Sequence, residues 1–112
     1  MTSRLPDLRF LLVGVLLACA SVESRVVHIG PPIRALAADA RVVFYRAPLT
    51  APGAREVALV ELTGYDDDID PLSWTPRLER IAREAGGNGV VWMRTDRARG
   101  FVRVIAAIVR VP

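Results

Sequence analysis

Residues 74–91 have the sequence WTPRLERIAREAGGNGVV, which contains the most strongly patterned element of the chain. Its apolar residues recur at a helical spacing and form one stripe: Trp74, Leu78, Ile81, Ala82 and Ala85. Ser73 or Thr75 is expected to cap the helix, and with Thr75 as the cap Pro76 takes the first helical position. Gly86-Gly87 is expected to supply the left-handed residue that ends it. The pattern predicts an amphipathic helix in which Leu78 and Ile81 anchor the core.

Strand-like segments flank this helix on both sides. Residues 41–46 and 56–63 precede it, and residues 89–94 and 101–111 follow it, each rich in β-branched residues. The last two segments are separated by a polar turn over residues 95–100, which favours an antiparallel hairpin. The predicted fold class is therefore α+β, with one helix packed on a small, mainly antiparallel sheet. The expected order along the chain is strand, strand, helix, strand, strand.

The N-terminal region has the pattern of a secretory signal peptide. A short segment with Arg4 and Arg9 precedes the apolar run 10–18, whose nine residues are about half of what a membrane-spanning helix needs. Residues 16–19, LLAC, resemble the lipobox of bacterial lipoproteins, in which the cysteine takes a diacylglyceryl group and becomes the mature N-terminus. We therefore predict that Cys19 is lipidated and carries fatty-acyl chains such as palmitate. An ordinary cleaved signal and an uncleaved anchor are the two alternatives.

Cleavage before Cys19 leaves 94 residues, which is enough for one small domain. The expected organisation is a signal peptide over 1–18, a lipidated N-terminus and tether over 19–40, and the α+β domain over 41–112. Within the tether, Val26-Val27-His28-Ile29 has the composition of a short strand, which Gly30-Pro31-Pro32 would stop.

The composition excludes some classes of function. All basic residues are Arg, and the part after residue 18 has 13 Arg against 11 acidic residues, a balance that does not indicate nucleic-acid binding. Cys19 is the single cysteine, so its lipidation would leave no thiol for a disulfide.

An acidic loop, residues 66–70, is the sharpest local feature. Asp66, Asp68 and Asp70 alternate as at the start of an EF-hand loop, but the sixth position is Pro71 instead of Gly and the twelfth is Arg77 instead of Glu. We expect a solvated loop whose carboxylates favour the start of the helix. A looser cation site is the alternative.

The other candidate residues favour structural roles. His28 has no partner at ligand spacing, and Ser21, Ser24 and Ser73 have no plausible base, which argues against a nucleophilic triad. The glycines of residues 86–89 follow a helix, whereas a phosphate loop precedes one. Four arginines around the last turn are expected to be solvated and partly offset by Asp96, with an anionic surface as the alternative partner: Arg94, Arg97, Arg99 and Arg103. Trp74 and Trp92 are expected in the core.

Residues 78–91 also resemble a motif of small outer-membrane lipoproteins related to the Rcs-system stress sensor, and of uncharacterised lipoproteins of similar size. In those proteins a helix ending in Ala-x-x-x-Gly-Ala-Asn-Ala-Val-Val runs straight into a strand. The matching residues are Ala82, Gly86, Asn88, Val90 and Val91, while Gly87 and Gly89 replace the two alanines. The stress sensors have disulfide-bonded cysteines in the domain, and this sequence has none there. The resemblance implies a packed helix-to-strand turn and carries over no catalytic residue.

Together these patterns predict a lipid-anchored, non-enzymatic protein of a Gram-negative envelope that binds another envelope component. Ala20 follows Cys19 where an Asp would resemble an inner-membrane retention signal, which favours the periplasmic face of the outer membrane. The alternatives are an envelope stress or cation sensor that uses the acidic loop, and an accessory subunit of a periplasmic enzyme. No catalytic residue, metal, cofactor or small-molecule substrate is expected.

Overall fold

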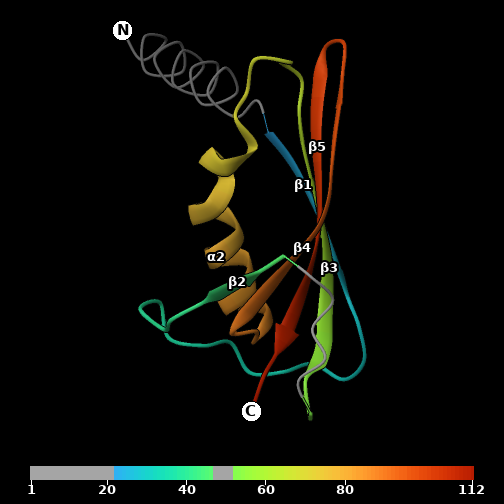
Figure 1. Cartoon of the computed structure of the whole chain (residues 1–112). Helices are drawn as coiled ribbons and strands as arrows, with labels where there is room; N and C mark the ends of the chain where they lie inside the picture. The colour runs from blue at the N-terminus through green and yellow to red at the C-terminus, as the bar shows by residue number, and fades with distance from the viewer. Residues whose placement is uncertain (1–21, 47–51) are drawn as a thin grey trace, which may run out of the picture.

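The computed structural model describes residues 22–46 and 52–112. Its elements are β1 (Val22–His28), β2 (Val43–Tyr45), β3 (Arg55–Gly64), the 3-10 helix η1 (Pro71–Trp74), α2 (Thr75–Ala85), β4 (Gly89–Ala98) and β5 (Phe101–Arg110). The strands form one sheet in the order β1-β3-β5-β4-β2, and α2 lies against one face of it (Figure 1). The β2–β4 pair is parallel and the other three pairs are antiparallel. The predicted α+β class is confirmed, but three strands precede the helix where two were expected.

The additional strand is β1, which lies in the segment expected to be a tether. It pairs with β3 along its whole length, from Val22 opposite Gly64 to His28 opposite Ala58. The strand ends just before Gly30-Pro31-Pro32. The prolines follow its last paired residue, so they do not interrupt its hydrogen bonds to β3. Farther on, the Leu36 N–H donates to the Arg83 carbonyl oxygen at 2.8 Å, so the segment after β1 is also bound to the domain. The signal peptide, Cys19 and Ser21 lie outside the described residues.

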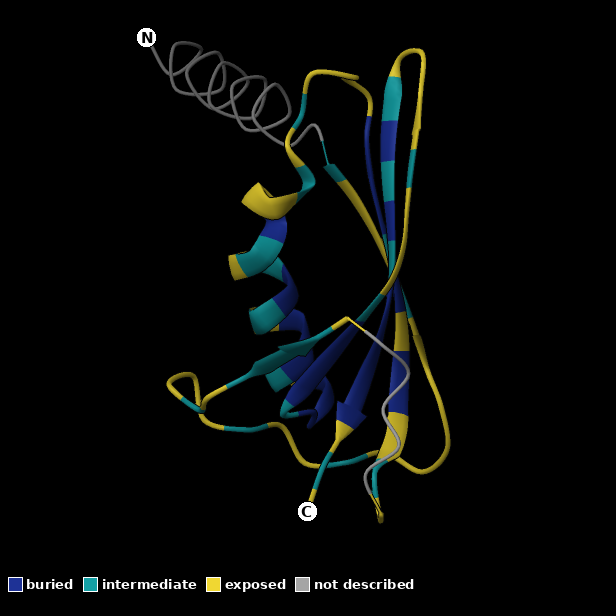
Figure 2. Cartoon of the chain, viewed as in Figure 1, coloured by how far each residue is buried: buried dark blue, intermediate teal, exposed yellow. Residues whose placement is uncertain are grey.

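The core lies between α2 and the covered face of the sheet. The whole predicted stripe is buried, with Leu78 fully buried and Ile81 8% exposed, which confirms both as core residues. The sheet contributes alternate residues of β5, its central strand, and of the neighbouring β3: Ala58, Val60 and Leu62 from β3, and Val102, Val104, Ala106 and Ile108 from β5. Figure 2 shows the buried side of α2 turned toward these strands. Among the described residues, no helix is long and apolar enough to cross a membrane.

The start of α2 differs from the prediction. Thr75 lies within the helix, and its hydroxyl donates to the Leu72 carbonyl oxygen at 2.9 Å instead of capping an N–H group. The capping carboxylate is that of Asp70, which accepts from the Leu72 N–H at 3.0 Å and starts η1. The predicted cap was wrong because a 3-10 turn precedes the helix and already positions its first turn.

The end of α2 follows the prediction. Gly86 is left-handed, with φ of 85°, and its N–H donates to the carbonyl oxygens of Ala82 and Arg83. At Gly87 a Cβ atom would overlap the Ile108 side chain, so the glycine permits close packing of the turn on β5. The Asn88 amide then joins the turn to Val111, donating to its carbonyl oxygen at 2.9 Å and accepting from its N–H at 2.8 Å. The glycine-rich segment is therefore a packed turn.

The predicted β4–β5 hairpin is confirmed, although its turn is tighter than expected. Ala98 pairs with Phe101, so only Arg99 and Gly100 form the turn, and Gly100 has φ of 85°. The strands extend through most of the segment expected as a polar loop.

Candidate functional site

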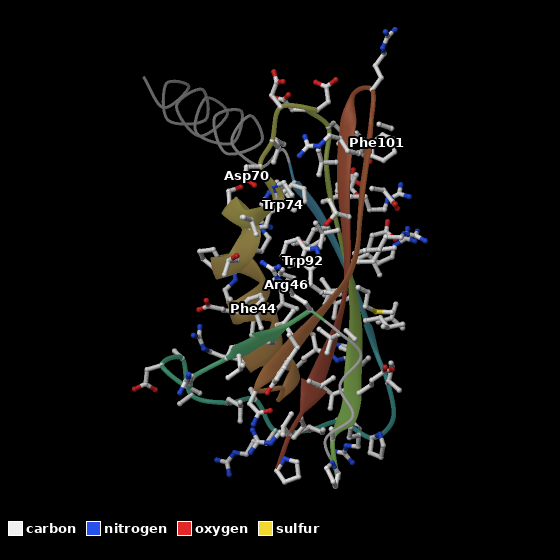
Figure 3. All side chains as sticks on the ribbon, viewed as in Figure 1. Phe44, Arg46, Asp70, Trp74, Trp92 and Phe101 are labelled. Carbon is white, nitrogen blue, oxygen red and sulfur yellow. The ribbon has the colours of Figure 1, made fainter. Side chains whose placement is uncertain are left out.

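A groove of about 680 Å³ lies where β2, η1 and β4 approach one another. Its lining is mainly apolar or aromatic, with three hydroxyl groups and one charged side chain: Phe44, Tyr45, Arg46, Pro71, Leu72, Thr75, Trp92 and Thr95. Figure 3 shows Phe44, Arg46 and Trp92 close together between the helix layer and the sheet. Concave, mostly apolar surfaces with a few placed polar groups are typical of binding sites.

The groove arises from the unequal lengths of two neighbouring strands. The short strand β2 pairs only with Gly89–Val91, whereas β4 continues to Ala98. Beyond Val91, this edge of β4 has no pairing strand within the described part of the chain. An edge with unpaired N–H and C=O groups can accept another strand. The groove thus combines an apolar surface with a free sheet edge.

Two side chains define the floor and the rim of the groove. Trp92 packs against the core and lines the groove, and its indole N–H donates to the Thr95 hydroxyl at 2.7 Å, which fixes the orientation of the ring. The expectation of a core position was therefore right for the fully packed Trp74 and only partly right for Trp92. Leu72 is 67% exposed on η1 and forms the rim of the groove beside Pro71 and Thr75, where it offers an apolar contact.

The acidic loop has a structural role in the fold. Arg97 of β4 donates to the carbonyl oxygens of Asp67 and Ile69, the latter at 3.3 Å, and thereby binds the loop to the β4–β5 hairpin. The carboxylates of Asp66, Asp67 and Asp68 come within 4.8 Å of one another, but all three residues are exposed. Asp70 caps η1, and Arg77 donates to the Ser24 hydroxyl at 3.2 Å. Asp70 therefore lies outside the cluster of three carboxylates formed by Asp66, Asp67 and Asp68.

The four arginines near the last turn do not form one surface. Arg94 pairs with Asp96 at 3.0 Å, as the charge pattern led us to expect. Arg103 lies 5.3 Å from the Phe101 ring centroid and 3.6 Å from the Glu61 carboxylate, on the face of the sheet opposite α2. Arg97 is engaged by the acidic loop on the helix side. Arg99 occupies the tip of the hairpin and is exposed.

The remaining candidates lie apart from the groove. His28 is exposed on the edge strand β1, paired with Ala58. Ser24 accepts from Arg77, and the Ser73 hydroxyl donates to the Asp70 carbonyl oxygen at 2.7 Å. Both serines therefore form hydrogen bonds that stabilise the fold, and neither is hydrogen-bonded to His28.

The face of the sheet opposite α2 carries Tyr65, a residue with a shifted pKa. The Tyr65 hydroxyl donates to the Glu23 carboxylate at 3.0 Å, which joins the chain after β3 to β1. This hydrogen bond and the negative charge of Glu23 raise the pKa of Tyr65 above its ordinary value. Neither residue lines the groove.

Comparison with known proteins supports the fold. No family model matches the chain, and no curated protein matches it. Among solved structures, the crystal structure of the Francisella virulence factor FvfA is similar, with a TM-score of 0.54 and 7% sequence identity. The match covers 78% of this chain and 96% of that chain. At this identity the likeness concerns the fold alone, and the resemblance of residues 78–91 to Rcs-related lipoproteins stays a prediction.

Proposed function

We propose that the protein is a lipid-anchored, non-enzymatic component of the cell envelope, held at the periplasmic face of the outer membrane, that binds an extended segment of another envelope protein in its groove. The observation that carries the binding role is the groove itself, where partly exposed apolar side chains adjoin a stretch of β4 that has no partner strand among residues 22–46 and 52–112. The anchor rests on the sequence, in which Cys19 ends a short apolar run with the residues of a lipobox.

An extended peptide suits the groove better than a small polar molecule. Leu72, Phe44 and Trp92 offer apolar contacts on one side, and the N–H and C=O groups of β4 beyond Val91 offer main-chain hydrogen bonds on the other. Strand addition of this kind derives affinity from the backbone and specificity from pockets for alternate side chains. Arg46 is exposed in the lining and favours an acidic residue in the bound segment.

The groove also favours binding over catalysis. Arg46 is its one charged lining residue, and an arginine stays protonated at neutral pH, so it serves as a fixed positive charge. The hydroxyls of Thr75 and Thr95 already bond within the fold, the first to Leu72 and the second to Trp92. Such a lining is suited to recognising a partner of matching shape and charge.

Cys19→Ser tests the anchor. We expect this variant to accumulate as an unprocessed precursor that a fatty-acid probe does not label, whereas the parent protein is labelled and has a mature mass beginning at Cys19. Normal processing of the variant with unchanged membrane partition would refute the anchor.

A photo-crosslinking residue at Leu72 tests the groove, with the same residue at Leu59 as the control. Leu59 is 38% exposed on the opposite face of the sheet, so it samples the same compartment without the groove. We expect a discrete crosslinked product from position 72, absent from position 59 and weakened when Arg46→Glu is added. The same products from both positions, or none from position 72, would refute binding in the groove.

A further inference from the structure

We propose that the tip of the β4–β5 hairpin, residues 98–101, rests on the phospholipid head groups of the membrane that holds the protein. This inference depends on the proposed lipidation of Cys19 and adds an orientation of the domain to it. It arises from the position of β1, which makes the connection between anchor and fold far shorter than the sequence suggested.

The first step is the length of the linker. Cys19 precedes Val22, the first residue of β1, by three residues. Fully extended, three residues span about 10 Å. A lipidated Cys19 would therefore keep the start of β1 within that distance of the membrane surface, whereas a tether reaching residue 40 would have let the domain move freely.

The second step is which part of the fold lies at this end. Val22 pairs with Gly64, and Gly64 pairs with Val102, so the start of β1 is level with a point two residues from Gly100 at the hairpin tip. Figure 1 shows the start of β1, the β3–η1 connection and the hairpin tip at the same end of the molecule, with the C-terminus at the other. At about 3.3 Å per residue, the tip extends about 7 Å beyond the level of Val22.

The third step compares these two lengths. The head-group layer of a bilayer is about 5–7 Å thick on each side. With Cys19 at the base of that layer and the linker fully extended, a tip that projects about 7 Å toward the bilayer already reaches the head groups. Since β1 and β5 are separated only by β3, the tip is also close to the anchor laterally, at about 10 Å. A linker that is less than fully extended brings the tip deeper into the head-group layer.

The composition of the tip suits such a position. Arg99 and Gly100 are exposed, and within the described part of the chain Arg99 has no hydrogen bond or ion pair. Phe101 follows with a half-buried ring, labelled near the tip in Figure 3. An arginine can bind lipid phosphate, and a phenylalanine side chain can insert among the head groups, as on the apolar face of interfacial helices. The Asp67 carboxylate accepts from the Gly100 N–H at 3.4 Å, so the exposed carboxylates of Asp66–Asp68 lie beside the tip. The short linker, and not net charge, therefore holds the tip at the membrane.

The test measures the distance of the tip from lipid in the mature lipoprotein. Lipidation consumes the only native thiol, so Arg99→Cys supplies a single site for a nitroxide label, and Arg55→Cys supplies the matched control. Both arginines are exposed, and Arg55 lies at the far end of the sheet, opposite Arg110. Each labelled protein is placed in phosphatidylcholine vesicles that contain a nickel-chelating lipid, and relaxation of the nitroxide by nickel is recorded.

We expect relaxation several-fold stronger at position 99 than at position 55, both at low and at high salt. Inserting ten Gly/Ser residues after Ala20 should bring the two values together, because the lengthened linker frees the domain. Equal relaxation at the two positions without the insertion, or a ratio that the insertion leaves unchanged, would overturn the orientation while leaving the anchor intact. A mature mass without lipid on Cys19 would overturn the anchor and the orientation with it.

Discussion

Replacing Leu78 by Ala should remove a large part of the stability of this domain. Leu78 is fully buried on the side of α2 that faces the sheet, within the core formed by the helix and the strands. The change deletes three carbon atoms, and at about 0.8 kcal/mol each the lost transfer free energy alone is about 2.4 kcal/mol. The cavity left behind adds to this, which gives an expected loss of about 3–4 kcal/mol, within the range of about 2–5 for such changes.

Leu72→Ala is the matched control, because it makes the same chemical change six residues earlier, in η1, at a side chain that is 67% exposed. Its effect on the free energy of unfolding should stay within about 0.5 kcal/mol. Urea titration followed by tryptophan fluorescence measures both, since the buried Trp74 reports on the same core. Small domains have total stabilities of about 5–15 kcal/mol, so the loss at Leu78 should move the midpoint strongly. A loss below about 0.5 kcal/mol would refute the assignment of this helix face.

Three other outcomes follow from the contacts described above. Asn88→Ala should cost about 1–3 kcal/mol in the same urea titration, because both hydrogen bonds to Val111 are lost in a partly buried turn; a neutral result would mean that the turn holds without them. The native pKa of Tyr65 is raised, so the contribution of its hydrogen bond to stability is present below pH about 10 and disappears as the pH rises through the native pKa. NMR titration of the Tyr65 ring should show this raised value, and Glu23→Gln should lower it; a value at or below the ordinary one contradicts the bond. Calorimetric titration with calcium should show no saturable one-to-one binding at micromolar affinity, and such binding, lost in Asp68→Asn, would restore the cation-sensor alternative.

Local patterns predicted the elements of this fold better than their assembly. The stripe around Leu78, the helix end at Gly86 and the β4–β5 hairpin depend on residues close in sequence, and the structure confirms all three. The role of β1 was predicted wrongly because this strand is stabilised by pairing with β3, thirty or more residues away. The residues of β1 alone do not indicate that partner. The sequence indicated a possible short strand at Val26–Ile29 that ends before Pro31 and Pro32, but it assigned this segment to a tether and missed the residues from Val22 to Arg25.

The groove was not predicted for a related reason. Trp92 lies in an apolar run, and such runs usually lie in cores, so its partial exposure depends on how far β2 continues beside it. The short length of β2 could be suspected from the prolines that follow it in sequence, but its parallel pairing with β4 could not. Likewise the bonds from Arg97 to the acidic loop join segments about thirty residues apart. The sequence shows an arginine cluster and an acidic loop, but not that Arg97 of the first binds the backbone of the second.

The central place of β5 in the sheet has a consequence for how the chain folds as it is made. β5 is the last strand along the sequence, yet it is the neighbour of both β3 and β4, and these two do not pair with each other. Until residues 101–110 have left the ribosome, the strands can form only two separate pairs, β1–β3 and β2–β4, and two-stranded sheets are marginal in water. Assembly of the sheet therefore waits until β5 has been made, so a chain exported before that point would still lack its packed core, as passage through a translocation channel requires.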